Sequence, residues 1–210
     1  MYHYIDFKNG IKHEEIKKAA QILRNGGIGI FPTETVYGIG ADISNSEAVE
    51  KIYEVKSRSR NKAISVLISN LSMVEEIAKN ISEEERKIME KFFPGPITII
   101  LKKNSKVSDI VTAGKDTVGV RMPANKVALK LIEEVGRPLA VPSANISDKP
   151  SGTEFNQIIK DFEDKIDFFI DEGKSKIGLA STIVQIENGE VNILREGIIK
   201  KEEIEKILNT

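Results

Sequence analysis

The sequence contains no cysteine, and this absence removes several classes of chemistry. Without thiols the chain forms no disulfide, offers no thiolate nucleophile and builds no zinc site from cysteine ligands. Only two histidines are present, His3 and His13, and both lie in a mixed, polar N-terminal stretch that is typical of surface positions. A Ser–His–Asp triad or a histidine metal site needs a histidine held by its surroundings. The sequence therefore favours chemistry that depends on positioning and charge.

Long apolar runs and a strong excess of one charge are absent as well. No stretch approaches the ~18–20 apolar residues of a membrane-spanning helix. The first residues, MYHYIDFKNGIKHEE, lack the basic start and apolar core of a signal peptide. A formal net charge of -1 at pH 7 argues against a general nucleic-acid-binding protein, which usually carries a basic excess. We therefore expect a cytoplasmic protein with no membrane partner. The near-neutral net charge does not exclude a local anion-binding site.

Periodicity along the 210 residues predicts an α/β fold, because helical patterns alternate with short apolar runs. Helices are predicted at 13–25, from a Ser44/Glu47 cap to about 55, and at 71–79, 83–92, 128–135, 155–162 and 201–208. Strands are predicted at 27–31, 63–69, 94–103, 117–123, 138–144, 167–170, 182–186 and 191–194. Ser82 with Glu85, and Thr153, are the other predicted helix caps. No repeat or linker divides the chain.

A cluster of four cations, Lys56, Arg58, Arg60 and Lys62, lies between a predicted helix and a predicted strand. We call residues 56–62 the basic junction. A lysine at a helix end suits the negative end of the helix dipole, which accounts for Lys56 alone. The other three lie past the helix, and like charges so close repel one another unless they are solvated or paired. The pattern leaves a solvated face and an anion site as open interpretations.

Two polar segments follow the ends of predicted strands. FPTETVYGIGAD (31–42) carries hydroxyls and glycines that permit a close approach of the backbone, but no GxGxxG or GxxxxGK[ST] phosphate motif, and it also fits an ordinary loop. PSANISDKPSG (142–152), which we call the serine loop, offers short donors where α/β sheets place ligands. Arg121 and Arg195 also lie near strand ends. Together these groups indicate a site where several segments converge on a polyanion.

In order along the chain, six motifs resemble the YrdC/TsaC family of threonylcarbamoyl-AMP synthases. They are PTETVYGIGAD, the Lys56-x-Arg58-x-x-x-Lys62 spacing, VGVRMP, PSAN, STIV and LREG, and the match covers about residues 12–200. No single motif is decisive, but the ordered set is specific. The resemblance implies one YrdC-like domain over 1–210. Its fold would be a twisted, mixed α/β sheet with helices packed around it, like that of DHBP synthase, and a concave basic face.

The same resemblance implies an L-threonylcarbamoyladenylate synthase, a nucleotidyltransferase. Such an enzyme condenses L-threonine, bicarbonate and ATP to threonylcarbamoyl-AMP and pyrophosphate, for the t6A modification of tRNA. Mg²⁺ would accompany the ATP. The partners would be tRNA-modifying proteins that use the adenylate, and weak tRNA binding is left open.

The resemblance also implies a role for each matching residue. ATP would be bound by Arg58, Lys62, Thr117, Ser143, Ser151 and Arg195. Threonine would be bound by Thr35, Arg121, Ser181 and the backbone of Val141. The catalytic residues beside the phosphates would be Lys56, Arg58 and Asn145. No residue is assigned to a metal.

Several positions depart from the family pattern. Ser59 and Ala63 stand where the basic motif often has proline, which loosens the loop and keeps the cations. Leu67 stands where many members have a histidine, so a histidine contact to threonine would be missing. We also expect the chain to end soon after the synthase domain, without the C-terminal domain of the longer form.

Two other functions are alternatives. The first is a nucleic-acid-binding module that uses the concave face, but no aromatic residues are interleaved with the cations of the basic junction, and the total charge is near neutral. The second is a carbamoyl-transfer domain such as that of the hydrogenase-maturation proteins, which are multidomain and carry zinc-binding cysteines. The synthase is the preferred hypothesis.

Overall fold

The computed structural model describes residues 1–209, in which one mixed sheet of ten strands runs through the molecule. The spatial order is β1-β8-β2-β3-β7-β4-β6-β5-β9-β10. The strands are β1 (His3–Asp6), β2 (Gly29–Phe31), β3 (Gly38–Asp42), β4 (Val66–Leu67), β5 (Ile97–Lys102), β6 (Thr117–Arg121), β7 (Leu139–Ala140), β8 (Phe168–Asp171), β9 (Thr182–Glu187) and β10 (Glu190–Arg195). The sheet contains parallel pairs, such as β4 with β6 and β5 with β9, as well as antiparallel ones, such as β2 with β3 and β5 with β6. The predicted mixed α/β fold is confirmed.

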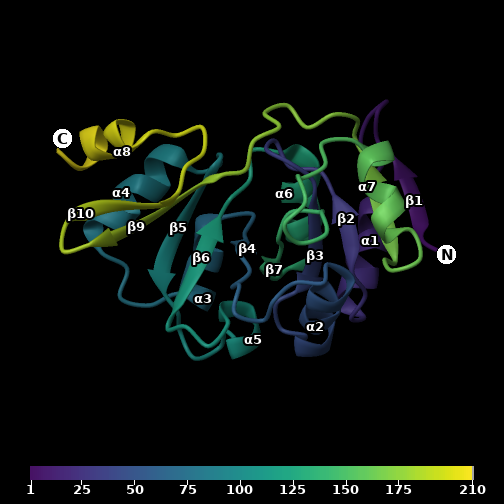
Figure 1. The fold of residues 1–210 in the computed structure, drawn as a ribbon, viewed down its shortest axis with the longest axis horizontal. Helices are drawn as coiled ribbons and strands as arrows, with labels where there is room; N and C mark the ends of the chain where they lie inside the picture. The colour runs from purple at the N-terminus through teal and green to yellow at the C-terminus, as the bar shows by residue number, and fades with distance from the viewer. Residues whose placement is uncertain (210) are drawn as a thin grey trace.

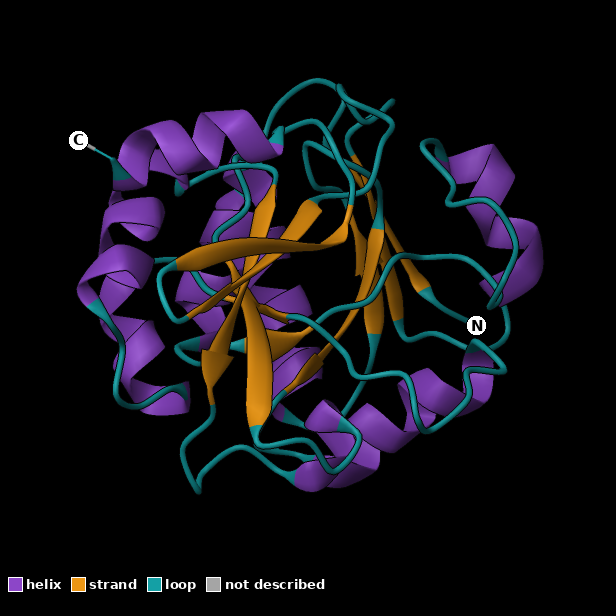
Figure 2. Ribbon diagram, turned by 60° about the vertical axis from the view of Figure 1, so that its left-hand side comes forward, coloured by secondary structure: helices purple, strands orange, loops and turns teal. Residues whose placement is uncertain are grey.

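Helices surround the sheet, as Figure 2 shows. They are α1 (His13–Arg24), α2 (Ser46–Val55), the 3-10 turn η1 (Leu71–Met73), α3 (Val74–Ile77), α4 (Glu83–Phe92), α5 (Asp109–Thr112), α6 (Lys126–Val135), α7 (Phe155–Phe162) and α8 (Lys201–Leu208). In Figure 1, α1 and α6 pack together near β2 and β3, whereas α4 and α8 pack together beside β5 and β10. No helix within residues 1–209 is both long and apolar enough to cross a membrane.

The apolar faces of the helices form the core on the sheet. The face predicted for α1 is buried, through Ile16, Ala19, Ala20 and Leu23. On α6, Ala128, Leu131, Ile132 and Val135 are buried in the same way. Each fully buried large aliphatic side chain contributes about 1.5–3 kcal/mol of transfer free energy. The helix α6 ends, as predicted, at Gly136, whose φ of 74° places it in the left-handed region that glycine tolerates best.

One helix cap is as predicted and another is not. The capping box of α4 is confirmed, because Ser82 Oγ accepts from the Glu85 N–H at 3.2 Å and a carboxylate oxygen of Glu85 accepts from the Ser82 N–H at 2.8 Å. The Ser44 cap of α2 is wrong, since the side chain of Asn45 accepts from the N–H of Ala48 at 3.0 Å. The Ser44 hydroxyl instead donates to Asp42 Oδ1, two residues earlier, at 2.7 Å.

The predicted Thr153 cap is also wrong. Glu154 is the N-cap residue of α7 and makes no side-chain capping bond. Both the N–H and the hydroxyl of Thr153 donate to Gln157 Oε1, at 3.0 and 3.2 Å. Thr153 therefore ties the serine loop to α7 from one residue before the cap.

The strand β3 lies inside the segment that also fitted an ordinary loop. All five of its residues are buried, so the alternation that marks a half-exposed strand is missing. Its two glycines lie in close contacts, since a Cβ on Gly38 would come within 2.4 Å of Val141 and one on Gly40 within 2.5 Å of the Phe31 ring. The short elements β1 and α5 were not predicted either, and the predicted strands at 63–69 and 138–144 shrink to β4 and β7.

Candidate active site

A cavity of ≈ 150 Å³ lies where the turn after β2 faces the ends of β4, β6 and β10 and the start of β9. Its lining combines cations with hydroxyl groups. The cations are Arg58, Arg121 and Arg195, and the hydroxyls include those of Thr35, Ser65, Thr98, Ser143 and Ser181. No group of three or more His, Cys, Asp or Glu side chains within residues 1–209 is placed to hold a metal ion. The predicted convergence of separate strand ends is therefore present, and its dominant charge is guanidinium.

The three arginines are close enough to affect one another. Burial lowers the pKa of Arg58, Arg121 and Arg195, because a charged group loses hydration in the interior. The positive charges of Arg121 and Arg58 lower the pKa of Arg195 further. A guanidinium stays protonated under such shifts, so Arg58 and Arg195, which form no ion pair with a carboxylate in the described residues, repel each other until an anion enters. The cavity is therefore suited to a ligand with more than one negative group.

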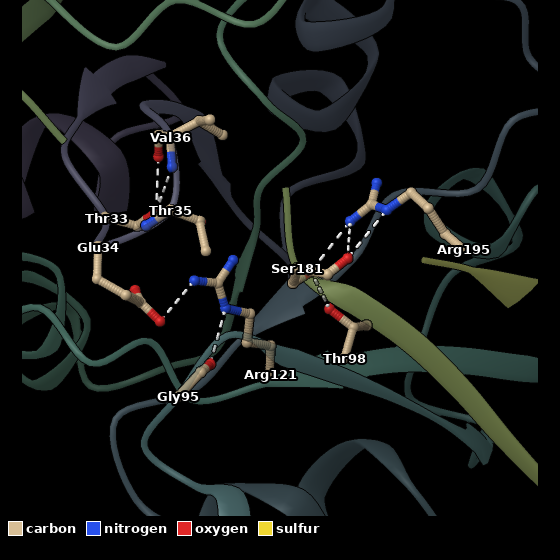
Figure 3. A network of polar contacts seen from close by, with 9 residues as sticks. All are labelled: Thr33, Glu34, Thr35, Val36, Gly95, Thr98, Arg121, Ser181 and Arg195. Atoms are coloured by element: carbon tan, nitrogen blue, oxygen red, sulfur yellow. Dashed lines mark hydrogen bonds and ion pairs between the residues drawn. The ribbon is translucent and has the colours of Figure 1, made fainter. Parts of the chain in front are cut away.

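Arg121, at the end of β6, is fixed by two contacts (Figure 3). Its Nη2 forms an ion pair with Glu34 Oε1 at 2.8 Å, and its Nε donates to the carbonyl of Gly95 at 3.2 Å. Both charged side chains are almost fully buried, with 8% of Arg121 and 6% of Glu34 exposed. The plane of the guanidinium is therefore set before any ligand binds.

Arg195, at the end of β10, is held by the start of β9 (Figure 3). Its Nε and Nη2 donate to the Ser181 carbonyl at 3.0 and 2.8 Å, and Nη2 lies 3.0 Å from Ser181 Oγ. Ser181 Oγ is in turn 2.8 Å from Thr98 Oγ1 on β5. Neighbouring strands therefore position one guanidinium and two hydroxyls along one wall of the cavity.

The opposite wall is the turn that follows β2. Thr33 Oγ1 lies 2.8 Å from Thr35 Oγ1 and donates to the Val36 carbonyl at 2.6 Å (Figure 3). The segment 172–181 braces the turn from outside, because the N–H groups of Ile177 and Gly178 donate to the carbonyls of residues 34 and 35, both at 2.8 Å. The hydroxyl of Thr35 is thus presented on a rigid turn.

The basic junction has one cation in the cavity, Arg58. Its Nε donates to the Lys62 carbonyl at 3.1 Å and its Nη2 to the Ala63 carbonyl at 2.7 Å, which folds the loop back on itself. Lys62 forms an ion pair with Asp148 of the serine loop at 2.8 Å and does not line the cavity. Arg60 pairs with a glutamate of α2. The solvated-face interpretation fits Arg60 and Lys62, whereas the anion-site interpretation stays a prediction for Arg58.

Lys56 does not line the cavity but contacts the serine loop, which does. It is 1% exposed, and its Nζ donates to the carbonyls of Ser143, at 2.5 Å, and Asn145. Its own carbonyl accepts from the Ser147 N–H at 2.9 Å. Burial and the nearby charge of Arg58 lower the pKa of Lys56 to about 7. The position fits a residue that supports the serine loop.

The serine loop is organised around Asn145. Its Oδ1 accepts from the hydroxyls of Ser143, at 2.5 Å, and Ser151, at 3.4 Å. Its Nδ2 donates to the carbonyls of Ile146 and Lys149, at 2.9 and 2.8 Å. Asn145 therefore fixes the loop that presents Ser143 to the cavity.

The structure brings together seven of the predicted site residues. Those that line the cavity are Thr35, Arg58, Arg121, Val141, Ser143, Ser181 and Arg195. Those that lie outside its lining are Lys56, Lys62, Thr117, Asn145 and Ser151. Thr117 begins β6, at the far end of the strand from Arg121. Their predicted roles stay predictions.

Three further polar residues were not predicted, namely two hydroxyls that line the cavity and one acid that pairs with Arg121. Ser65 and Thr98 are single hydroxyls inside apolar strand sequences, AISVLIS and ITIILKK, and such an interruption is a usable signal because a buried hydroxyl needs a partner. Glu34 carried no such signal, since an acid in a polar turn is normally solvated. The two histidines lie at the surface as predicted, and His3 Nε2 is 2.8 Å from a carboxylate oxygen of Glu15.

Comparison with known proteins connects this arrangement to one family. The Sua5/YciO/YrdC family model, described as "Telomere recombination", matches residues 21–197. A threonylcarbamoyl-AMP synthase of Pyrococcus abyssi is 42% identical over 204 residues, which are 97% of this chain and 60% of that protein. A putative threonylcarbamoyl-AMP synthase of Methanocaldococcus jannaschii is 40% identical over 193 residues, which are 90% of each chain.

Among solved structures, the crystal structure of P. abyssi Sua5 complexed with L-threonine superimposes with a TM-score of 0.94. The identity is 42%, and the match covers 97% of this chain and 60% of that one. The chain thus spans about three fifths of the length of the first of these relatives.

Proposed function

The chain belongs to the Sua5/YciO/YrdC family, and on this premise we propose that it is a threonylcarbamoyl-AMP synthase. The reaction is the condensation of L-threonine, bicarbonate and ATP to L-threonylcarbamoyladenylate and pyrophosphate, which is a nucleotidyl transfer. The observation that carries this proposal is the convergence of Arg58, Arg121 and Arg195 on one small hydroxyl-lined cavity. A reaction that joins two anionic substrates needs cations at both ends of the site.

The end of the cavity at Arg121 fits an amino acid. The guanidinium would take the threonine carboxylate, while the hydroxyls of Thr35 and Ser181 lie on opposite walls and would face its polar groups. Leu67 also lines the cavity and gives an apolar surface that a methyl group can contact. The L-threonine complex of the P. abyssi relative supports this choice of substrate.

The end at Arg58 and Arg195 fits the phosphates of ATP. Both guanidinium groups would donate charge-assisted hydrogen bonds to phosphate oxygens. Ser143 adds a hydroxyl from the serine loop, and Lys56 beneath the loop holds its backbone in place. Lys62, at the rim, would exchange its partner Asp148 for a phosphate when the nucleotide binds.

The chemistry needs no covalent nucleophile from the protein. The threonine nitrogen and bicarbonate form a carbamate with loss of water. A carbamate oxygen then attacks the α-phosphorus of ATP, and the bond to the β-phosphate breaks to release pyrophosphate. The three arginines bring the two anions together and spread the charge that develops on the phosphate oxygens.

Mg²⁺ would belong to this reaction as a companion of the nucleotide. Because no cluster of carboxylates or histidines in residues 1–209 could cage a metal ion, the phosphates of ATP would supply its ligands. The bound ion would neutralise phosphate charge. The arginines would still bind and orient the phosphate oxygens that remain exposed.

The product would be handed on to other proteins. A mixed anhydride of a carbamate and a phosphate is labile in water, so tRNA-modifying proteins that use the adenylate would act soon after its release. We propose a t6A pathway on these grounds, with any tRNA contact of this chain weak at a net charge of -1.

The test is pyrophosphate release from ATP with threonine, bicarbonate and Mg²⁺, each omitted in turn and without RNA. We expect release only in the complete mixture, with the adenylate detected by mass spectrometry of a short reaction. Tight tRNA binding at physiological salt, with no adenylate formed in the absence of tRNA, would instead support the binding-module alternative.

A further inference from the structure

Glu34 is a buried acid that does not itself line the cavity but forms an ion pair with Arg121, which does. Its side chain is 6% exposed and lies 2.8 Å from Arg121 Nη2, as Figure 3 shows. Within residues 1–209, neither carboxylate oxygen accepts a hydrogen bond of ordinary geometry. The ion pair with Arg121 is therefore the main compensation for burying this carboxylate, and neither partner can be removed without leaving a buried charge.

Through its ion pair with Arg121, the charge of Glu34 makes the two ends of the cavity unlike. Arg121 is neutralised by its ion pair, whereas Arg58 and Arg195 pair with no carboxylate among the described residues. One part therefore carries two uncompensated positive charges, and the other is close to neutral. A polyphosphate suits the first part, and a zwitterion, which is neutral overall, suits the second.

We propose that Glu34 is the positioning and specificity residue of the amino-acid end of the cavity, which it makes selective for a zwitterion over a simple anion. This inference rests on the proposed function. Without Glu34, Arg121 would be a third uncompensated cation that attracts phosphate and repels the ammonium group of an amino acid. With Glu34, the guanidinium is neutralised and oriented, yet its Nη1 donates to none of the described residues and stays available to a carboxylate.

The test compares Glu34→Gln with the unaltered protein by calorimetry, using L-threonine and inorganic phosphate as probes. In the unaltered protein, phosphate should compete with ATP and leave threonine affinity unchanged. In the variant, threonine affinity should fall about tenfold or more, and phosphate should now compete with threonine. Glu34→Asp keeps the charge and should keep the selectivity. Glu133→Gln, an exposed site on α6, is the matched control and should behave like the unaltered protein.

The selectivity readout separates this role from a merely structural one, because loose packing alone would weaken threonine binding without creating phosphate competition. If Glu34→Gln binds threonine normally, or never admits phosphate, the role of Glu34 is wrong while the synthase proposal stands. If Glu34→Gln does not fold, the measurement on the unaltered protein still tests the inference. Competition between phosphate and threonine for the unaltered protein would overturn it. Absence of any threonine binding to the unaltered protein would overturn both proposals.

Discussion

Replacing Lys56 by methionine removes a buried ammonium group and keeps an unbranched side chain of similar length. The Nζ donates to two carbonyls of the serine loop, those of Ser143 and Asn145. Each carbonyl left without a donor costs about 1–3 kcal/mol, although water that reaches the loop recovers part of this. The variant should therefore be less stable than the unaltered protein, by an amount that depends on pH.

The pH dependence follows from the pKa of Lys56, which is lowered from 10.5 to about 7 in the folded protein. Between these values the unfolded chain holds a proton that the folded protein has released, so stability rises with pH. A difference of one bound proton between the unfolded and folded states changes the free energy of unfolding by about 1.4 kcal/mol per pH unit. Between pH 7 and about pH 9 this sums to about 2 kcal/mol, an upper bound because the two carbonyl acceptors favour the charged form.

The assay is urea and thermal unfolding of the unaltered protein, of Lys56→Met and of Lys91→Met, an exposed control on α4, from neutral to mildly alkaline pH. The gap between the unaltered protein and Lys56→Met should widen by about 1–2 kcal/mol as pH rises. For a chain of this size, each kcal/mol corresponds to about 2–4 °C in Tm. The control should run parallel to the unaltered protein. If the stability of Lys56→Met also changes with pH in parallel with that of the unaltered protein, Lys56 is not a desolvated group bound to the serine loop.

Three further predictions concern the substrates. Arg58→Ala should weaken ATP binding by about 1.5–3 kcal/mol, and Lys62→Ala by less because Lys62 is exposed. If calorimetry gives the same ATP affinity for both variants and the unaltered protein, the assignment of the phosphates to this end of the cavity is wrong. Arg121→Ala should reduce threonine affinity far more than ATP affinity, and equal losses for both ligands would count against separate ends. L-Serine should be a poorer substrate than L-threonine by about 1 kcal/mol in kcat/KM, since it lacks one methyl group; equal turnover would argue against a fitted pocket.

The sequence was sufficient where local pattern and burial agree. The helices α1, α4, α6 and α8 repeat apolar residues every three or four positions over at least eight residues, and each was predicted within a few residues of its bounds. The strand β3 was not, because a fully buried strand with two glycines shows neither alternation nor high β-propensity. The helix caps failed where several short polar residues compete for one position, as Ser44 and Asn45 do before α2.

The site was predictable as a set of residues and not as an arrangement. Arg121 and Arg195 stood out because a guanidinium follows an apolar strand in both cases. The ion pair of Arg121 with Glu34 joins residues 87 positions apart, and the contact of Lys56 with Ser143 joins residues equally distant. No local pattern encodes such a pairing, because it depends on which strand ends the sheet brings to one place.

The basic junction shows why a count of neighbouring cations is a poor measure of an anion site. Arg60 and Lys62 each pair with an acid and are largely exposed, so their contribution is screened by salt. The ammonium group of Lys56 donates to a backbone carbonyl of the serine loop and does not line the cavity. Only Arg58 adds its charge to the cavity, where it meets Arg121 and Arg195 from distant strands. The positive field of the cavity is thus a product of the sheet order, which sets β6 and β10 on the two sides of β5 and β9.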